Sequence, residues 1–360
     1  MNMMTRVAVD ATRQAAYRQQ VAERAAQLRR QLAVPSETAP AQQCDPEQAR
    51  MIGEEALRYA RRVLTRHVAW PSTAALDTTL LWCLHCAARD DEGELIWRTT
   101  PRLLFTSAER GSGKSTALDL VAILTGSRFG RLPKISGPAF AALVGKFHEV
   151  AVLDEARLIF GTGQRSQELQ GMLLAGSTAG ANMLVMRGGN ATPTPVSGAV
   201  AYAGKDNLIT GCGDSVSDLL DRSIRITMQR PARHYPDIDE DAERAGKLAH
   251  QGFATWAAAF RDDLRAEAAR LSREACEAAE DESADDVAAG VLRRTQIWRP
   301  LRAAAAVLGN GWPERIDAAA AELAPASSQR PVTSGTSPEA AAAWLAELEQ
   351  AAAGWTGEED

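Results

Sequence analysis

The chain has 360 residues, of which 45% are hydrophobic and 24% charged, and its formal net charge is −6 at pH 7. This length allows one large domain or two smaller ones, and the composition excludes a disordered or fibrous chain. The negative charge argues against a general attraction to nucleic acid, although an acidic protein can still carry a basic pore or groove. Five cysteines without a disulfide-like spacing, and no apolar stretch of roughly 18 residues, predict a cytoplasmic protein with no membrane partner.

The first predicted element is a helix within residues 1–34. Its apolar residues recur at three- and four-residue steps, which favours either a short coiled coil or a helix packed on its own domain. Residues 35–46, rich in Pro, Ala and Gln, have the composition of a linker. A helical pattern then runs through the first part of residues 47–100, up to about residue 88.

Predicted strands alternate with predicted helices between residues 101 and 230. Strands are expected at 102–107, 131–135, 149–153, 196–203 and 223–228, and helices at 115–125, 138–147 and 164–174. The segment 182–196 is expected to form a β-hairpin with its turn at 188–190. Such alternation indicates an α/β fold, with a parallel sheet covered by helices on both faces.

Alanine-rich helices are expected over residues 231–323, with acidic runs that favour solvated surfaces. Residues 324–338 have the composition of a flexible linker, and residues 339–360 are expected to form a short amphipathic helix and an acidic tail.

Residues 108–115 read AERGSGKS and have the spacing of a Walker A motif, with alanine where glycine is more usual at the first position. The motif follows an apolar strand and precedes an apolar helix, so backbone N–H groups and a helix start would face the phosphates of ATP. Residues expected to contact the nucleotide are Gly111, Ser112, Gly113, Lys114, Ser115 and Thr116. Lys114 would reach the β- and γ-phosphates, and the Ser115 hydroxyl would ligate Mg²⁺. The alternative is a glycine-rich turn without a ligand.

Two carboxylates, Asp154 and Glu155, follow the apolar run VAVL. Parallel sheets bind ligands at the C-terminal ends of their strands. Asp154 is therefore expected to hold Mg²⁺, and Glu155 is expected to polarise the attacking water as a general base. A strand that ends in a solvated acidic turn is the alternative.

Three basic residues are further candidates. Lys205 lies where the next strand ends and where a polar side chain could sense the γ-phosphate. Arg222 precedes the last strand and is expected to act on the ATP of a neighbouring subunit, unless it only pairs with Asp221. Arg187, at the hairpin turn, is a candidate contact to single-stranded DNA, with an exposed loop arginine as the alternative.

The pair Cys83 and Cys86 has the spacing of a metal half-site. No second pair accompanies it, and both thiols fall in an apolar helical pattern. Core thiols are therefore the favoured interpretation.

The segments PRLLFTSAERGSGKST, VAVLDEA, LLDRSIRI and IWRPLRAAAAVLGNGWP occur in this order between residues 54 and 323. In this they resemble the uncharacterised P-loop domain of phage, plasmid and mobile-element proteins that is often joined to a primase module. The resemblance implies an AAA+-like or superfamily-3-like helicase motor in DNA replication. It also implies that Lys114, Ser115, Asp154 and Glu155 form the nucleotide site. Arg222 would then be an arginine finger, and Arg293 a second nucleotide sensor.

The chain departs from that family in two ways. Within these 360 residues, we expect helix and linker, and not a primase or zinc-binding module, ahead of the motor, and Gln296 stands where an acidic residue is expected. We therefore expect an ATP-hydrolysing motor, a homo-oligomer in the form of a ring such as a hexamer, which acts on single-stranded DNA beside a separate primase or other protein partner. The alternative is a protein remodeller, switch or defence-related ATPase that unwinds nothing.

Overall fold

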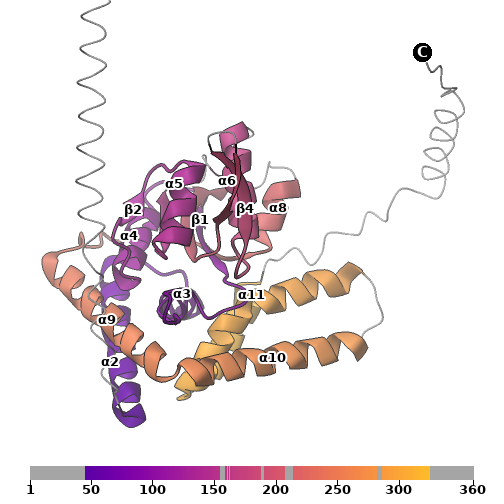
Figure 1. The fold of residues 1–360 in the computed structure, drawn as a ribbon. Helices are drawn as coiled ribbons and strands as arrows, with labels where there is room; N and C mark the ends of the chain where they lie inside the picture. The colour runs from indigo at the N-terminus through magenta and orange to yellow at the C-terminus, as the bar shows by residue number, and fades with distance from the viewer. Residues whose placement is uncertain are drawn as a thin grey trace, which may run out of the picture.

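The computed structural model describes residues 45–154, 159, 161, 163–187, 190–206, 214–281 and 286–324. A five-stranded parallel sheet with helices on both faces occupies one part of the molecule, and a second group of helices packs beside it (Figure 1). The α/β fold expected from the sequence is confirmed at this level. The helix predicted within 1–34, most of the linker at 35–46, and almost all of 324–360 lie outside the described residues.

The sheet has the strand order β2-β3-β6-β1-β7. Its members are β1 (Arg102–Ser107), β2 (Arg131–Leu132), β3 (Ala151–Asp154), β6 (Val200–Lys205) and β7 (Ser223–Thr227). Every pairing is parallel, so all five strands end at the same edge of the sheet. Strand β6 lies between β1 and β3, and it therefore separates the two strands that carry the sequence motifs.

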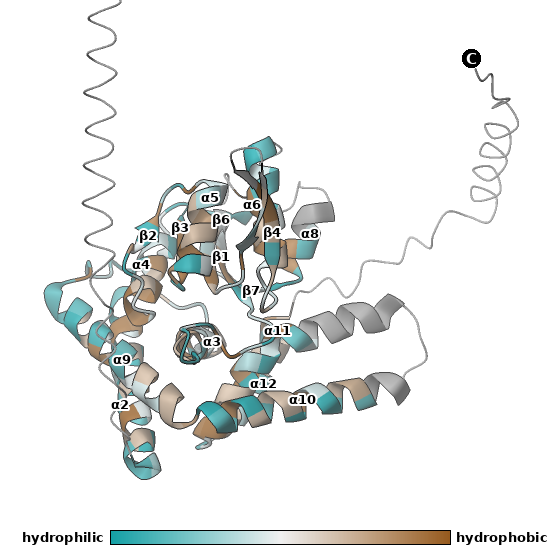
Figure 2. Ribbon diagram, viewed as in Figure 1, coloured by the Kyte–Doolittle hydropathy of each residue, from teal (hydrophilic) through white to brown (hydrophobic). Residues whose placement is uncertain are grey.

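Two apolar cores cover the two faces of the sheet. Side chains alternate along a strand, so Leu103 and Phe105 of β1 join one core while Leu104 joins the other. The first core includes α4 (Lys114–Leu124), which Figure 2 shows as largely hydrophobic beside the sheet. The second core is formed with α5 (Gly137–Ala141), the π-helical turn η1 (Ala142–Lys146), α6 (Gln164–Ala175) and α8 (Asp214–Leu220).

A β-hairpin projects between α6 and β6, as the sequence predicts. Its strands, β4 (Asn182–Arg187) and β5 (Asn190–Pro195), pair antiparallel as a separate sheet. The turn residues 188 and 189 lie outside the described part of the chain. The strand predicted at 196–203 begins later than expected, at Val200, because residues 196–199 form the connection from the end of β5 to β6.

The remaining helices form one group, here called the helical group. It comprises α2 (Pro46–His67), α3 (Thr73–Cys86), α9 (Glu240–Ala259), α10 (Arg261–Asp281), α11 (Asp286–Leu308) and α12 (Trp312–Glu322). Helices α2 and α9 approach so closely that a Cβ added at Gly53 would lie 2.5 Å from Trp256 Cδ1, so this position requires glycine. The segments 47–100 and 231–323, which the sequence delimits separately, therefore pack together. Within the described part of the chain, none of the helices has the length and apolar character that crossing a membrane would need.

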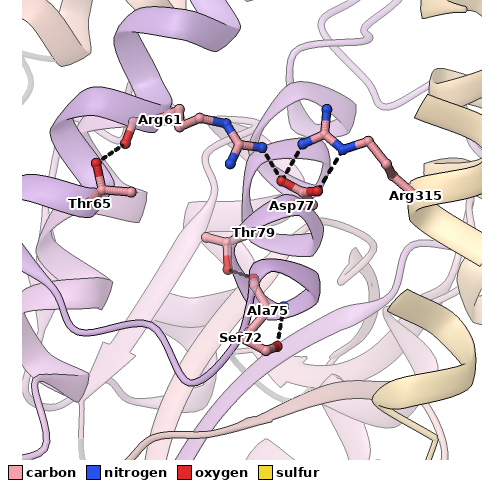
Figure 3. Close-up of polar contacts among 7 residues, drawn as sticks. All are labelled: Arg61, Thr65, Ser72, Ala75, Asp77, Thr79 and Arg315. Atoms are coloured by element: carbon pink, nitrogen blue, oxygen red, sulfur yellow. Dashed lines mark hydrogen bonds and ion pairs between the residues drawn. The ribbon is translucent and has the colours of Figure 1, made fainter. Parts of the chain in front are cut away.

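Helix α3 is the buried centre of the helical group, and Figure 1 shows it end-on. Its carboxylate Asp77, 2% exposed, is held by Arg61 of α2 and Arg315 of α12. Arg315 Nε lies 2.8 Å from Asp77 Oδ2, and Arg315 Nη2 lies 2.6 Å from Oδ1 (Figure 3). One buried carboxylate thus joins three helices. The thiols of Cys83 and Cys86 are also buried in α3, which raises their pKa and confirms that they are core residues.

Candidate functional site

The candidate site lies at the sheet edge where the strands end. The register pairs Ser107, the last residue of β1, with Lys205 of β6, and it pairs Asp154 of β3 with Ala203. Residues 108–113, here called the glycine loop, leave β1 at this edge and lead into α4. The topology therefore brings together the glycine loop, Lys205 and Asp154.

The glycine loop turns at the two glycines that the sequence indicates. Gly111 has a φ of 73° and Gly113 a φ of 83°, both in the left-handed region that favours glycine. Gly113 is the N-cap of α4, so the backbone N–H groups at the start of this helix face the loop. The region around Gly111 is open, because no atom of the described structure beyond Gly111 and its two chain neighbours lies within 4 Å of the position that a Cβ would take.

The side chain of Lys114 folds back over the glycine loop. Its Nζ donates to Ser112 Oγ at 3.0 Å and also to Ser107 Oγ. Partial burial lowers the pKa of Lys114, while the negative charges of Asp206 and Asp154 oppose that shift. The ammonium group is thus held at the loop by neutral hydroxyl groups, and it has no ion-pair partner within 4 Å among the described residues.

The carboxylate of Asp154 is contacted by side chains from α4 and from β2. Ser115, in the first turn of α4, donates from Oγ to Asp154 Oδ2 at 3.0 Å. Arg131 of β2 also binds Oδ2 through Nη1, while its Nε donates to Asp119 Oδ1 of α4 at 2.7 Å. The hydrogen bond to Asp119, with the nearby charge of Asp154, raises the pKa of Arg131. The Asp154 carboxylate therefore lies between a hydroxyl and a guanidinium.

A second ion pair stands beside the end of β6. Arg225 of β7 donates from Nη2 to Asp206 Oδ1 at 2.7 Å and from Nε to Thr106 Oγ1 at 3.1 Å. Lys205, next to Asp206, is half-buried, and its positive charge contributes to the lowered pKa of Lys114. Lys205, Asp154 and Asp206 thus all lie close enough to act electrostatically on Lys114.

Arg222 is far from this cluster along the sheet. Its neighbour Ser223 pairs with Arg102, the first residue of β1, so Arg222 lies at the opposite edge from the glycine loop. Its Nη1 donates to the carbonyl of Leu174 at 3.1 Å and to Ser177 Oγ at 2.9 Å. In this position Arg222 cannot reach the glycine loop of its own chain.

Arg131, Asp119 and Arg225 belong to the site but were missed from the sequence. A signal for Arg225 exists, because it is a charged residue between two isoleucines of a predicted strand. Arg131 and Asp119 carry no such local signal.

Three predicted residues cannot be placed. Glu155 lies outside the described residues, as do the side chains of Arg187 at the end of β4 and Arg293 in α11. Thr116, in the first turn of α4, is half-buried next to Ser115.

In the described ranges, no group of three or more His, Cys, Asp or Glu residues is placed to hold a metal ion. A site for Mg²⁺ does not need such a group, because this ion keeps several waters and takes one or two carboxylates or hydroxyls from the protein. No protein-family model matches the chain, and no curated protein matches it significantly.

Proposed function

We propose that this chain is a magnesium-dependent ATPase and that its nucleotide site is the glycine loop together with Asp154. The observation that carries the proposal is the 3.0 Å contact between Ser115 Oγ and Asp154 Oδ2. A hydroxyl at the start of a helix beside a carboxylate at the end of a buried strand is the pair that positions Mg²⁺ in P-loop ATPases.

The glycine loop supplies the groups that bind phosphate. The positive φ angles of Gly111 and Gly113 turn the backbone, which would let its N–H groups face phosphate oxygens, and α4 adds the positive end of its dipole. The ammonium group of Lys114 already lies at the loop, where it donates hydrogen bonds to neutral serine hydroxyls. Exchanging these hydroxyls for phosphate oxygens would strengthen the binding of the ammonium group, because phosphate adds a negative charge that attracts it.

The residues present fit a magnesium ion. Two oxygens 3.0 Å apart suit adjacent positions of an octahedral ion, with Ser115 as a ligand and Asp154 as a ligand or as an acceptor for its water. Bound Mg²⁺ would supply positive charge that neutralises the charge developing on the phosphates. Arg131 already binds Asp154 Oδ2, so it would compete with the ion for this carboxylate oxygen. Glu155, which follows Asp154 in the chain, would activate the attacking water, and Lys205 would contact the γ-phosphate.

The proposed role of Arg222 in hydrolysis depends on an oligomer. An arginine at the far edge of the sheet has no access to its own nucleotide, so a role in hydrolysis requires the site of a neighbouring subunit. With the resemblance to replicative motors of phages and mobile elements, this favours a ring-forming, nucleic-acid-dependent ATPase such as a DNA helicase. The hairpin β4–β5 would then contact single-stranded DNA through Arg187.

The test is the rate of ATP hydrolysis with and without single-stranded DNA. Wild type should hydrolyse ATP faster when DNA is present, and Lys114→Ala should lose at least about 99% of the activity. Lys247→Ala is the matched control, since among the described residues this exposed lysine of α9 pairs only with Glu243. Hydrolysis that DNA does not change would favour the protein remodeller or switch over the helicase.

A further inference from the structure

A cavity of about 400 Å³ opens where α10 and α11 meet the segment 96–99. This segment leads into the start of β1, so the cavity lies toward the sheet edge opposite the glycine loop. The Arg98 carbonyl accepts from Ala179 N at 3.0 Å, which connects the cavity wall to the segment that leads into β4. The cavity is therefore separate from the nucleotide site and adjoins the base of the hairpin.

Four arginines are the charged residues among the described residues that line this cavity: Arg98, Arg265, Arg273 and Arg299. On α10, the lining positions 265, 268, 269, 272 and 273 recur at three- and four-residue steps, so they share one face of the helix. Arg270 lies on another face of α10, where it pairs with Glu267 and Glu274. Hydrophilic bands run along α10 in Figure 2.

The positive charges in the cavity are largely uncompensated. No carboxylate of the described residues lies within ion-pair distance of Arg98, Arg273 or Arg299, and Arg265 reaches only Asp262, at 3.8 Å. Arg299 donates from Nη1 to Ser272 Oγ at 2.9 Å, but its Nε is buried without a partner in the described structure. Partial burial lowers the pKa of Arg299.

We propose that this cavity, here called the arginine pocket, binds phosphate groups of a phosphorylated ligand. The planar guanidinium group presents a fork of donors that matches phosphate in two-point contacts, and several arginines around one hollow suit a multiply charged group. The volume is in the range of ligand pockets. The ligand is either the phosphodiester backbone of single-stranded nucleic acid or a small phosphorylated molecule. The inference does not rest on the proposed ATPase activity.

Two variants test the arginine pocket without disturbing the core. Arg98→Gln and Arg273→Gln each remove an exposed guanidinium that has no ion-pair partner among the described residues. Arg270→Gln is the matched control, because it makes the same charge change on the same helix but outside the cavity. All variants are made in the full chain carrying Lys114→Ala, which weakens binding of the probes at the glycine loop and is common to every comparison.

The probes are a labelled thymidine oligonucleotide of about 12 nucleotides, the length that a single-strand site typically covers, and inorganic pyrophosphate. The double variant Arg98→Gln/Arg273→Gln should weaken binding of at least one probe by about tenfold or more, while Arg270→Gln changes it by less than about twofold. If the oligonucleotide is the ligand, the double variant should also lower the salt dependence of binding by about 1.4 in the log–log slope. Binding of pyrophosphate alone would assign the pocket to a small phosphorylated molecule.

Three results would overturn the proposal. The first is that neither probe binds, and the second is that Arg270→Gln weakens binding as much as the double variant does. The third is that a polyglutamate peptide binds as tightly as the probes, which would show an acidic-peptide site without selectivity for phosphate.

Discussion

The hydroxyl of Ser115 and the carboxylate of Asp154 lie 39 positions apart in the sequence, yet Ser115 Oγ donates to Asp154 Oδ2 at 3.0 Å. The same Oδ2 is bound by Arg131. A guanidinium and a metal ion repel each other, so Arg131 should oppose Mg²⁺ at this carboxylate.

Arg131→Gln should therefore lower the magnesium concentration needed for half-maximal ATP hydrolysis, by roughly threefold or more, because removal of a nearby positive charge favours the ion. The measurement is a magnesium titration of ATP turnover. Arg128→Gln is the control, since Arg128 pairs with Glu149 and does not contact Asp154. A higher magnesium requirement in Arg131→Gln would show instead that Arg131 only orients the carboxylate.

Arg222→Ala should reduce ATP turnover by about a thousandfold, the effect typical of a missing arginine finger. The informative experiment mixes this variant with Lys114→Ala, which is inactive for a different reason. Ring interfaces that combine the intact loop of one variant with the intact Arg222 of the other should restore activity. Failure of the mixture to exceed either variant alone, in a protein that assembles, would contradict a role in trans and leave Arg222 as a local contact to Leu174 and Ser177.

Asp77→Ala should destabilise the protein by roughly 2–4 kcal/mol, because it leaves two arginines without their shared carboxylate. We expect a smaller loss of unfolding free energy than for a fully buried ion pair, because the side chains of Arg61 and Arg315 are 34% and 37% exposed. Urea unfolding measures it. Asp317→Ala breaks a pair whose carboxylate is 60% exposed and should cost less than about 1 kcal/mol. Equal effects of the two substitutions would show that Asp77 does not join the helices.

His85 should make stability sensitive to acid. Burial in α3 lowers the pKa of His85 to about 4, although its hydrogen bond to the Trp82 carbonyl opposes the shift. The folded state thus prefers the neutral ring, so its contribution is fully present above the ordinary pKa of 6.5 and is lost as pH falls toward 4. Between pH 7 and pH 5 this amounts to about 2 kcal/mol of unfolding free energy.

The measurement compares urea unfolding of wild type and His85→Gln at the two pH values. Glutamine does not titrate, so the acid-induced loss should be about 2 kcal/mol smaller in the variant. An equal loss in both proteins would show that carboxylates alone cause the acid sensitivity.

Sequence reasoning predicts the part of the fold that local signals determine. Strand β1, the glycine loop and α4 follow from an apolar run, glycines at turns and a helix that ends before Gly126, whose φ is 67°. The hairpin follows from alternating residues on both sides of a glycine turn. In contrast, the continuous helical pattern expected from residue 47 to 88 is two helices, because Pro71 interrupts it and Ser72 caps α3.

The rest of the site depends on contacts between distant segments. Nothing local indicates that β6 inserts between β1 and β3, or that Arg131 of β2 reaches Asp154. The close packing of α2 on α9 likewise requires Gly53 to face Trp256, some two hundred positions further along the chain. Strand order and helix pairing are decided by the total apolar area that is buried, which no short pattern encodes.

The central claim is that Ser115 and Asp154 hold the magnesium of bound ATP, and calorimetric titration of ATP with and without Mg²⁺ tests it most directly. Wild type should bind Mg²⁺-ATP, and Lys114→Ala should weaken binding by about tenfold or more under both conditions. Ser115→Ala and Asp154→Asn should weaken binding only when magnesium is present. Equal effects of these two substitutions with and without the ion, or unchanged binding in Lys114→Ala, would contradict the proposed site.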